Sequence, residues 1–222
     1  GKTNVAANLA ISFASRGQKV ALLDADYALA NVDILLGLSP KFTIENVLEG
    51  NMSVGEIMVD GPGGIKVVPA SSGVQKLTRL GNRQLNNLFN ALQILEKHFD
   101  QLIIDTAAGM SEEVISLLHA AGEVIMVTNP EPPAFVDSYA LIKHLVKIEP
   151  TPRIRVLVNQ VRGERESLMV YDRIAKTVEK FLKKKIEYMG HIAEDESVKN
   201  AVRNRRPFVL HSPKSPASSC IN

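Results

Sequence analysis

Short, continuous apolar runs alternate along the chain with longer segments of helical periodicity. The runs consist mostly of apolar residues, two of them closed by an acid, and lie at residues 19–24, 65–69, 101–105, 124–127, 154–158 and 186–189. Strands of this kind are buried on both faces, as they are in parallel sheets covered by helices. The helical segments lie at residues 5–15, 82–98, 112–120, 135–148, 171–182 and 198–203. We therefore predict an α/β fold with a predominantly parallel, twisted sheet and helices on both faces.

Composition narrows the class of protein further. The 222 residues are 45% hydrophobic and 23% charged, as in ordinary globular proteins, and without a linker or an internal repeat we predict a single domain over residues 1–222. The net charge of +2 gives no global field that would attract nucleic acid. Cys220 is the one cysteine, which excludes disulfides and a cluster held by several thiolates of one chain. No apolar run reaches the roughly 18 residues of a membrane span and there is no signal peptide, so we expect a cytoplasmic location.

The first three residues, Gly1, Lys2 and Thr3, match the end of a phosphate-binding loop. In such a loop the backbone N–H groups at a helix N-terminus point at phosphates. The Lys reaches the β- and γ-phosphate oxygens, and the Thr hydroxyl binds Mg²⁺. The tripeptide alone is a weak signal, since it occurs by chance in on the order of one chain in ten of this length. Its place at the start of a helix in an α/β pattern strengthens it.

Three acidic residues follow two of the predicted strands, at the edge where ligands bind in open α/β sheets. Asp24 and Asp26 come at the end of the first strand, and Asp105 ends the strand at 101–105, shortly before Gly109. An Asp in this position can hold Mg²⁺, and the turn after it can sense a γ-phosphate. Asp26 lies one step further out, where a loop could bring it to an attacking water. The competing interpretation is that both residues have structural roles, with Asp105 capping a helix or a turn. For Asp24, the structural and the functional interpretations are about equally supported.

Several segments together resemble one protein family. They are residues 1–10 (GKTNVAANLA), 23–26 (LDAD), 29–37 (LANVDILLG), 104–109 (IDTAAG), 128–131 (TNPE), 137–143 (DSYALIK), 158–160 (VNQ) and 190–192 (GHI). On these segments the chain resembles the MinD/ParA group of P-loop ATPases, also called the deviant Walker A group, over essentially its whole length. More narrowly, residues 31–37 and 105–109 resemble the bacterial regulators of flagellum number in the FlhG/FleN (YlxH) subfamily.

The resemblance implies a role for each matching residue at the phosphates. Gly1, Lys2 and Thr3 would bind the nucleotide, with Lys2 acting as a catalytic residue at the β- and γ-phosphates. Thr3 and Asp105 would hold Mg²⁺, the latter through water. Asp26 would be the second catalytic residue and would position the attacking water.

The resemblance also implies two switch segments and a base contact. Asn31 would contact the nucleotide and would belong, with Asp33, to the same switch as Asp26. The turn from Asp105 to Gly109 would be the second switch. Asn159 would recognise the edge of the adenine.

The function implied by the resemblance is a nucleotide switch. ATP and Mg²⁺ would be the cofactors, and the activity would be hydrolysis of ATP to ADP and phosphate. ATP would drive a homodimer that regulates the number or placement of flagella. The implied partners are an FlhF-type GTPase and flagellar basal-body or transcription-regulator proteins, and no nucleic-acid partner is expected. The intact protein would associate reversibly with the inner membrane through a C-terminal helix.

Two other functions are compatible with the same motifs. A MinD- or ParA-type ATPase would position the division machinery or DNA cargo with the same chemistry. A non-hydrolysing scaffold would use the dimer face alone, but the presence of Lys2, Asp26 and Asp105 argues against it. A nitrogenase-type reductase is excluded, because its cluster needs two thiolates from each subunit.

The ends of the chain suggest a piece of a longer protein. It begins without Met at the tail of a phosphate loop and stops in a polar segment rich in Ser and Pro. We therefore expect truncation at both ends, with loss of the first strand, most of the phosphate loop including the family's signature lysine, and the C-terminal membrane helix. A processed protein with a polar tail is the alternative, and ATP hydrolysis by this piece alone is left open.

Arg203, Arg205 and Arg206 form a basic cluster just before Pro207. Such a cluster could contact DNA or lipid headgroups. Because the net charge is only +2, a solvated surface is the preferred interpretation.

Overall fold

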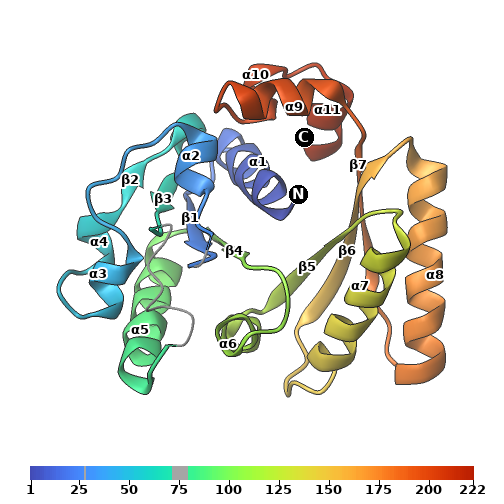
Figure 1. Cartoon of the computed structure of the whole chain (residues 1–222), viewed down its shortest axis with the longest axis horizontal. Coiled ribbons are helices and arrows are strands. Elements are labelled where there is room, and N and C mark those ends of the chain that lie inside the picture. The colour runs from blue at the N-terminus through green and yellow to red at the C-terminus, as the bar shows by residue number, and fades with distance from the viewer. Residues whose placement is uncertain (28, 72–79) are drawn as a thin grey trace. The chain divides into compact units, whose positions relative to one another are not determined.

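The computed structural model describes residues 1–27, 29–71 and 80–222 (Figure 1). Its contacts divide the chain into two compact units. The first comprises Gly1–Ala107, Ser197–Lys214 and Ile221–Asn222, and the second comprises Ala108–Glu196 and Ser215–Cys220. The single domain predicted over residues 1–222 stays a prediction.

The first unit is built on a four-stranded sheet in the order β2-β3-β1-β4. Its strands are β1 (Val20–Ala25), β2 (Val59–Asp60), β3 (Lys66–Val68) and β4 (Gln101–Thr106). β1 pairs in parallel with both β3 and β4, and the two-residue strand β2 pairs antiparallel with β3. Every residue of β1 is buried. This is the burial expected of a strand covered on both faces, and it explains the continuous apolar run in the sequence.

Short and long helices surround this sheet. They are α1 (Lys2–Ser15), α2 (Val32–Leu36), α3 (Ile44–Leu48), α4 (Val54–Ile57), the 3₁₀ turn η1 (Pro62–Gly64), α5 (Asn82–His98) and α10 (Phe208–His211). α1 packs against β1, β4 and α10, while α5 packs against β4 and α3. The turn η1 approaches α1 so closely that a Cβ atom on Gly63 would lie 2.7 Å from Cγ2 of Ile11. A side chain at position 63 would therefore displace α1 or the turn.

The second unit contains a three-stranded parallel sheet in the order β5-β6-β7. Its elements are α6 (Glu112–Ala120), β5 (Glu123–Thr128), α7 (Pro132–Leu145), β6 (Arg153–Val161), α8 (Glu164–Leu182) and β7 (Glu187–Ala193). α7 packs against β5 and α8, and α8 packs against β6 and β7. Ser111 caps α6, since its Oγ accepts the N–H of Val114 at 3.4 Å. Two further helices, α9 (Glu196–Arg203) and α11 (Pro216–Ile221), each contain residues of both units.

The predicted elements differ from the structure where the hydrophobic pattern is weak. The helix predicted at 82–98 is α5, but α8 begins at Glu164 rather than at 171, because its first turn is polar. α2, α3 and α4 have four or five residues each, which is too short to show periodicity. α10 ends just before the polar segment rich in Ser and Pro, and α11 begins within it at Pro216. Within the described ranges, no helix is both long enough and apolar enough to cross a membrane.

Candidate functional site

The candidate site lies at the carboxyl ends of β1 and β4 in the first unit. Parallel pairing places Asp24 of β1 directly opposite Asp105 of β4. Both residues are buried, with exposed fractions of 1% and 4%. Two neighbouring buried carboxylates repel each other when both are ionised, so each needs its own cation or hydrogen-bond donor.

The start of α1 supplies donors to Asp105. The side chain of Thr3 is hydrogen-bonded to the Asp105 carboxylate, and the positive charge of Lys2 acts on the same carboxylate. Burial outweighs both effects and raises the pKa of Asp105 above its ordinary value. The structure therefore brings together the predicted phosphate-loop residues and the predicted magnesium ligand.

Asp24 binds the backbone of the loop between β1 and α2. Its Oδ1 accepts the N–H of Asp26 at 3.1 Å. Its Oδ2 accepts the N–H groups of Asn31 and Val32, each also at 3.1 Å. Burial raises the pKa of Asp24 to about 6, although the three N–H groups act in the opposite direction. Of the two interpretations that the sequence left open for Asp24, these contacts support the structural one.

Asp26 and Asn31 lie on the loop that Asp24 holds. Asp26 is half-buried, its Oδ1 accepts the N–H of Leu29 at 3.0 Å, and its charge also raises the pKa of Asp105. Asn31 is exposed, and its Nδ2 donates to the carbonyl of Leu29 at 3.1 Å. The structure thus brings Asp26 near the Thr3–Asp105 pair, with Asn31 further along the same loop.

Asp33 lies in the first turn of α2, at the end of the same loop. Its Oδ1 accepts the N–H of Ile34 at 2.7 Å. The helix closes at Gly37, which has a φ of 67° and donates its N–H to the carbonyls of Asp33 and Ile34. The predicted first switch is therefore a loop with a capped helical end.

Asn159 and Gly109 belong to the second unit. Asn159 is half-buried near the end of β6, and its Oδ1 accepts the N–H of Gln160 at 3.0 Å. Gly109 has a φ of 97°, a conformation that other residues rarely adopt. The adenine contact of Asn159 and the switch at Gly109 stay predictions.

Asn8 is a fully buried amide in the middle of α1, and it is not among the residues predicted for the site. Its Oδ1 accepts the N–H of Val209 at 2.9 Å, and its Nδ2 donates to the carbonyl of Asn4 at 2.7 Å. The first bond fastens α10 to α1 across 201 positions of sequence. The available signal was a polar side chain within the apolar run of α1, but nothing in the sequence points to its partner.

The donor set of the site fits Mg²⁺. Magnesium prefers oxygen ligands and is usually bound by one or two carboxylates together with waters and phosphates, rather than by a protein cage. Thr3 and Asp105 supply a hydroxyl and a carboxylate that already contact each other. In residues 1–27, 29–71 and 80–222, no group of three or more His, Cys, Asp or Glu side chains could hold a metal ion. The residues present therefore suit a metal ion that arrives with a phosphate ligand.

A lysine, a threonine and a helix N-terminus meet buried carboxylates at the carboxyl end of a parallel sheet. This arrangement defines the chain, as a class, as an α/β phosphate-binding protein of the P-loop type. A model of the CobQ/CobB/MinD/ParA nucleotide-binding domain matches residues 1–208, and the chain belongs to this family.

Two bacterial relatives have regulatory or flagellar names. The antiactivator FleN of Pseudomonas aeruginosa is 42% identical over 98% of this chain and 78% of its own length. The flagellum site-determining protein YlxH of Helicobacter pylori is 30% identical over 100% of this chain and 75% of its own length. The predicted resemblance to the FlhG/FleN subfamily is therefore confirmed.

Solved structures of MinD share the fold. The cell division ATPase MinD of Pyrococcus furiosus has a TM-score of 0.83 at 24% identity, covering 100% of this chain and 90% of that chain. MinD of Pyrococcus horikoshii, complexed with Mg-ADP, has a TM-score of 0.82 at 23% identity, with coverages of 100% and 87%. The MinC:MinD complex of Aquifex aeolicus has a TM-score of 0.80 at 25% identity, covering 100% of this chain and 87% of that chain.

Together these matches confirm the predicted α/β fold class and the assignment to the MinD/ParA ATPases, with ATP and Mg²⁺ as cofactors at the level of the family. They also show that a member of this fold forms a complex with a protein partner. The roles of the individual site residues stay predictions.

Proposed function

We propose that the protein is an ATP-dependent, dimerising switch ATPase that regulates the number or placement of flagella. The main support is the meeting of Lys2, Thr3 and Asp105 at one sheet edge, in a chain 42% identical to the antiactivator FleN. Identity to MinD of Bacillus subtilis is lower, at 29% over a similar length. This difference favours the flagellar function over the positioning of a division septum.

In the proposed mechanism, the start of α1 binds the phosphates. Gly1, Lys2 and Thr3 contact them, with the ammonium of Lys2 balancing negative charge. Thr3 would hold Mg²⁺ directly and Asp105 would hold it through water, and the bound ion would neutralise phosphate charge. The existing hydrogen bond between Thr3 and Asp105 keeps both oxygens oriented before the nucleotide arrives.

The loop after β1 supplies the group that acts on water. Asp26 accepts a hydrogen bond from the attacking water and orients it toward the γ-phosphate. The three N–H bonds to Asp24 fix the backbone of this loop, so they keep Asp26 in place. Asn31 contacts the nucleotide from the same loop, and Asn159 contacts the adenine. Positioning and charge neutralisation without covalent chemistry are suited to the slow turnover of a switch.

The proposed partners follow from the switch. ATP drives a homodimer, and this dimer engages an FlhF-type GTPase and flagellar basal-body or transcription-regulator proteins. The intact protein is proposed to reside in the cytoplasm and to associate reversibly with the inner membrane through a C-terminal helix. Nucleic acid is not a proposed partner.

A MinD-type ATPase that positions the division machinery is the second candidate. It is supported by the TM-score of 0.83 to MinD, a similarity that at 24% identity concerns the fold alone. A ParA-type carrier of DNA has no residue in the site that favours it. A scaffold without hydrolysis would not need Lys2, Asp26 and Asp105 together.

Counting flagella tests the proposed function. Deletion of the gene should raise the number of flagella per cell, because loss of an antiactivator releases flagellar gene expression. The wild-type gene should restore the number, and the Asp26→Ala variant should not. Asp60→Ala is the matched control, since Asp60 is an exposed acid paired with Lys66 at the far edge of the sheet, and it should restore the number fully. Unchanged flagella with misplaced septa would instead identify the MinD-type function.

A further inference from the structure

Positive charge is concentrated at the C-terminal end of the chain. Residues 197–222 contain no Asp or Glu, but they contain Lys199, Arg203, Arg205, Arg206 and Lys214. These five cations give the segment a charge of +5. Because the whole chain has a net charge of +2, residues 1–196 carry a net charge of −3. A local excess of one sign in a nearly neutral chain is a feature of a binding surface for the opposite sign.

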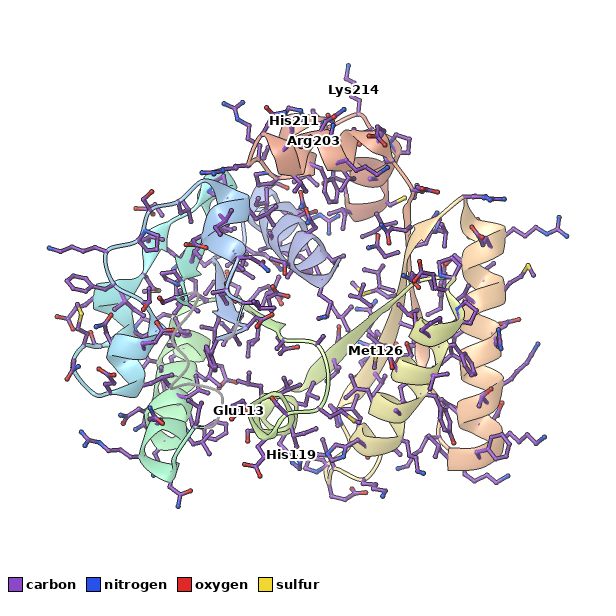
Figure 2. All side chains as sticks on the ribbon, in the orientation of Figure 1. Glu113, His119, Met126, Arg203, His211 and Lys214 are labelled. Carbon is purple, nitrogen blue, oxygen red and sulfur yellow. The ribbon has the colours of Figure 1, made fainter. Side chains whose placement is uncertain are left out.

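The centre of this segment is the end of α9 together with the turn that follows it. We call residues 202–206 the basic turn. Arg203, Arg205 and Arg206 are all exposed there. In the part of the chain that the structure describes, none of the three has an ion-pair partner. Figure 2 shows Arg203 on this segment together with His211 and Lys214, and Lys214 extends away from the ribbon. The charges are therefore free to meet a ligand.

Arg205 occupies a backbone position that normally belongs to glycine. The N–H of Arg206 bonds to the carbonyl of Ala201 and the N–H of Arg205 to that of Val202, each at 3.0 Å. This pair of bonds is the Schellman ending of a helix, in which the residue after the cap adopts a left-handed conformation. Arg205 has a φ of 51° there. A left-handed residue with a Cβ costs about 1–2 kcal/mol, so glycine at position 205 would relieve this strain.

The basic turn also packs against the end of the first switch. A Cβ atom on Gly37 would lie 3.4 Å from the backbone oxygen of Arg205. Gly37 is the cap of α2, which follows the loop that carries Asp26 and Asn31. On the other side, α10 is fastened to α1 by the bond from Val209 to Asn8. A movement of α2 would therefore also displace the basic turn.

The side chains at this surface favour a protein ligand over nucleic acid or lipid. Val202 in the basic turn and Leu210 in α10, the next helix along the chain, are exposed, at 41% and 48%. Arginine binds carboxylates in pairs of hydrogen bonds and is enriched at protein interfaces, whose cores are more apolar than their rims. Between residues 197 and 214 no exposed large apolar residue is aromatic. Single-stranded nucleic acids are typically bound by stacking on aromatic side chains, and membrane-surface helices commonly carry Trp or Phe on their apolar face.

We propose that the basic turn is a docking surface for an acidic protein segment that also carries aliphatic side chains. The carboxylates of that segment pair with Arg203, Arg205 and Arg206, and its apolar side chains cover Val202 and Leu210. Docking itself does not require hydrolysis. Its link to α2 rests on the proposed function, because α2 responds to nucleotide only if the loop of Asp26 is a switch.

Binding of a fluorescein-labelled peptide of Glu and Leu, followed by anisotropy with the intact protein, tests this proposal. Arg205→Gly should weaken binding about tenfold, the effect of losing one charged hydrogen bond. The same variant should unfold at the same temperature as the wild type or higher, because glycine relieves the left-handed strain. A peptide with Gln in place of Glu should not bind.

Lys183→Gly is the matched control. Lys183 is also an exposed cation with a left-handed backbone, φ 54°, at the end of α8 in the second unit. The Lys183→Gly variant should bind the peptide with the same affinity as the wild type. Equal losses in the two variants, or no binding of the peptide at all, would overturn the proposal. So would Arg205-dependent binding of a DNA duplex or of phosphatidylglycerol vesicles without binding of the peptide.

The link to α2 has a separate readout. Peptide affinity should differ between the ADP and ATP forms of the intact protein. Equal affinities in both forms, with the Arg205 dependence retained, would overturn the link while the docking surface stands. A protein that binds the peptide as expected but does not hydrolyse ATP would count against the proposed function and not against the docking surface.

Discussion

Asp24 and Asp105 are directly paired across β1 and β4, and each buried carboxylate binds a different segment of the chain. Asp105 is hydrogen-bonded by Thr3 at the start of α1. Asp24 accepts the backbone N–H groups of the loop that carries Asp26. One pair of strands thus connects the proposed phosphate-binding helix to the proposed hydrolytic loop, with Asp105 as the proposed metal ligand and Asp24 as the proposed positioning residue.

Asp26→Ala should abolish ATP hydrolysis and leave ATP binding intact. Removal of a group that orients water typically costs at least about 100-fold in rate, whereas the phosphate contacts of Lys2 and Thr3 are unchanged. Phosphate release measures the rate, and titration with a fluorescent ATP analogue measures the affinity. Asp60→Ala, which removes an exposed acid on β2, is the control for a general loss of charge. Normal turnover in Asp26→Ala would remove Asp26 from the mechanism.

Asn159→Ala should weaken ATP binding about tenfold, as expected for the loss of one or two hydrogen bonds to the base. Oδ1 of Asn159 already accepts the N–H of Gln160, so Nδ2 is the group proposed to donate to the adenine. Asn159→Asp keeps the oxygen and loses the donor, and it should therefore bind ATP as weakly as the alanine variant. Isothermal titration with ATP and Mg²⁺ measures both. Unchanged affinities would mean that another residue recognises the base.

Asp24 should make stability depend on pH. Its pKa is about 6 in the folded chain against 3.8 for a free side chain. Below about pH 4 it is protonated in both states, and between about pH 4 and pH 6 only the unfolded state readily releases the proton. The folded state therefore loses stability as the pH rises, by about 3 kcal/mol in total.

Asp24→Asn provides the comparison, because an amide does not titrate in this range. Urea unfolding without nucleotide should show the wild type losing about 3 kcal/mol relative to the variant between about pH 4 and pH 7. The variant also loses acceptors for the loop N–H groups, which lowers its stability by an amount independent of pH. A constant difference between the two proteins across this range would contradict the raised pKa.

Asn8→Ala should destabilise the protein by about 2 kcal/mol, since it leaves the buried N–H of Val209 without an acceptor. Asn204→Ala is the control. Asn204 is exposed and also donates from Nδ2 to the carbonyl four residues earlier, at 2.8 Å, so its loss should cost less than about 0.5 kcal/mol. The free energy of unfolding in urea measures both variants. Equal effects would show that α10 does not depend on the bond to Asn8.

The parts of the fold and site that the sequence predicts are those with a local signal. Continuous apolar runs indicated the buried strands, and because parallel strands end at one edge, Asp24 and Asp105 could be expected together. The bond between Asn8 and Val209 could not be predicted, because it joins residues far apart in the sequence. The left-handed Arg205 was equally hidden, since the pattern of a helix ending favours glycine there. Short helices such as α2 are stabilised by tertiary contacts and are too short to show a periodic hydrophobic pattern in the sequence.

Sedimentation velocity of the intact protein with ADP and with ATP tests the central claim most directly. Asp26→Ala keeps the ATP state from decaying during the run, and Lys2→Ala removes the proposed phosphate contact. We predict a monomer with ADP, a dimer with ATP in the Asp26→Ala variant, and a monomer with ATP in the Lys2→Ala variant. A monomer in the Asp26→Ala variant with ATP bound, or a dimer that forms equally with ADP, would contradict the nucleotide switch.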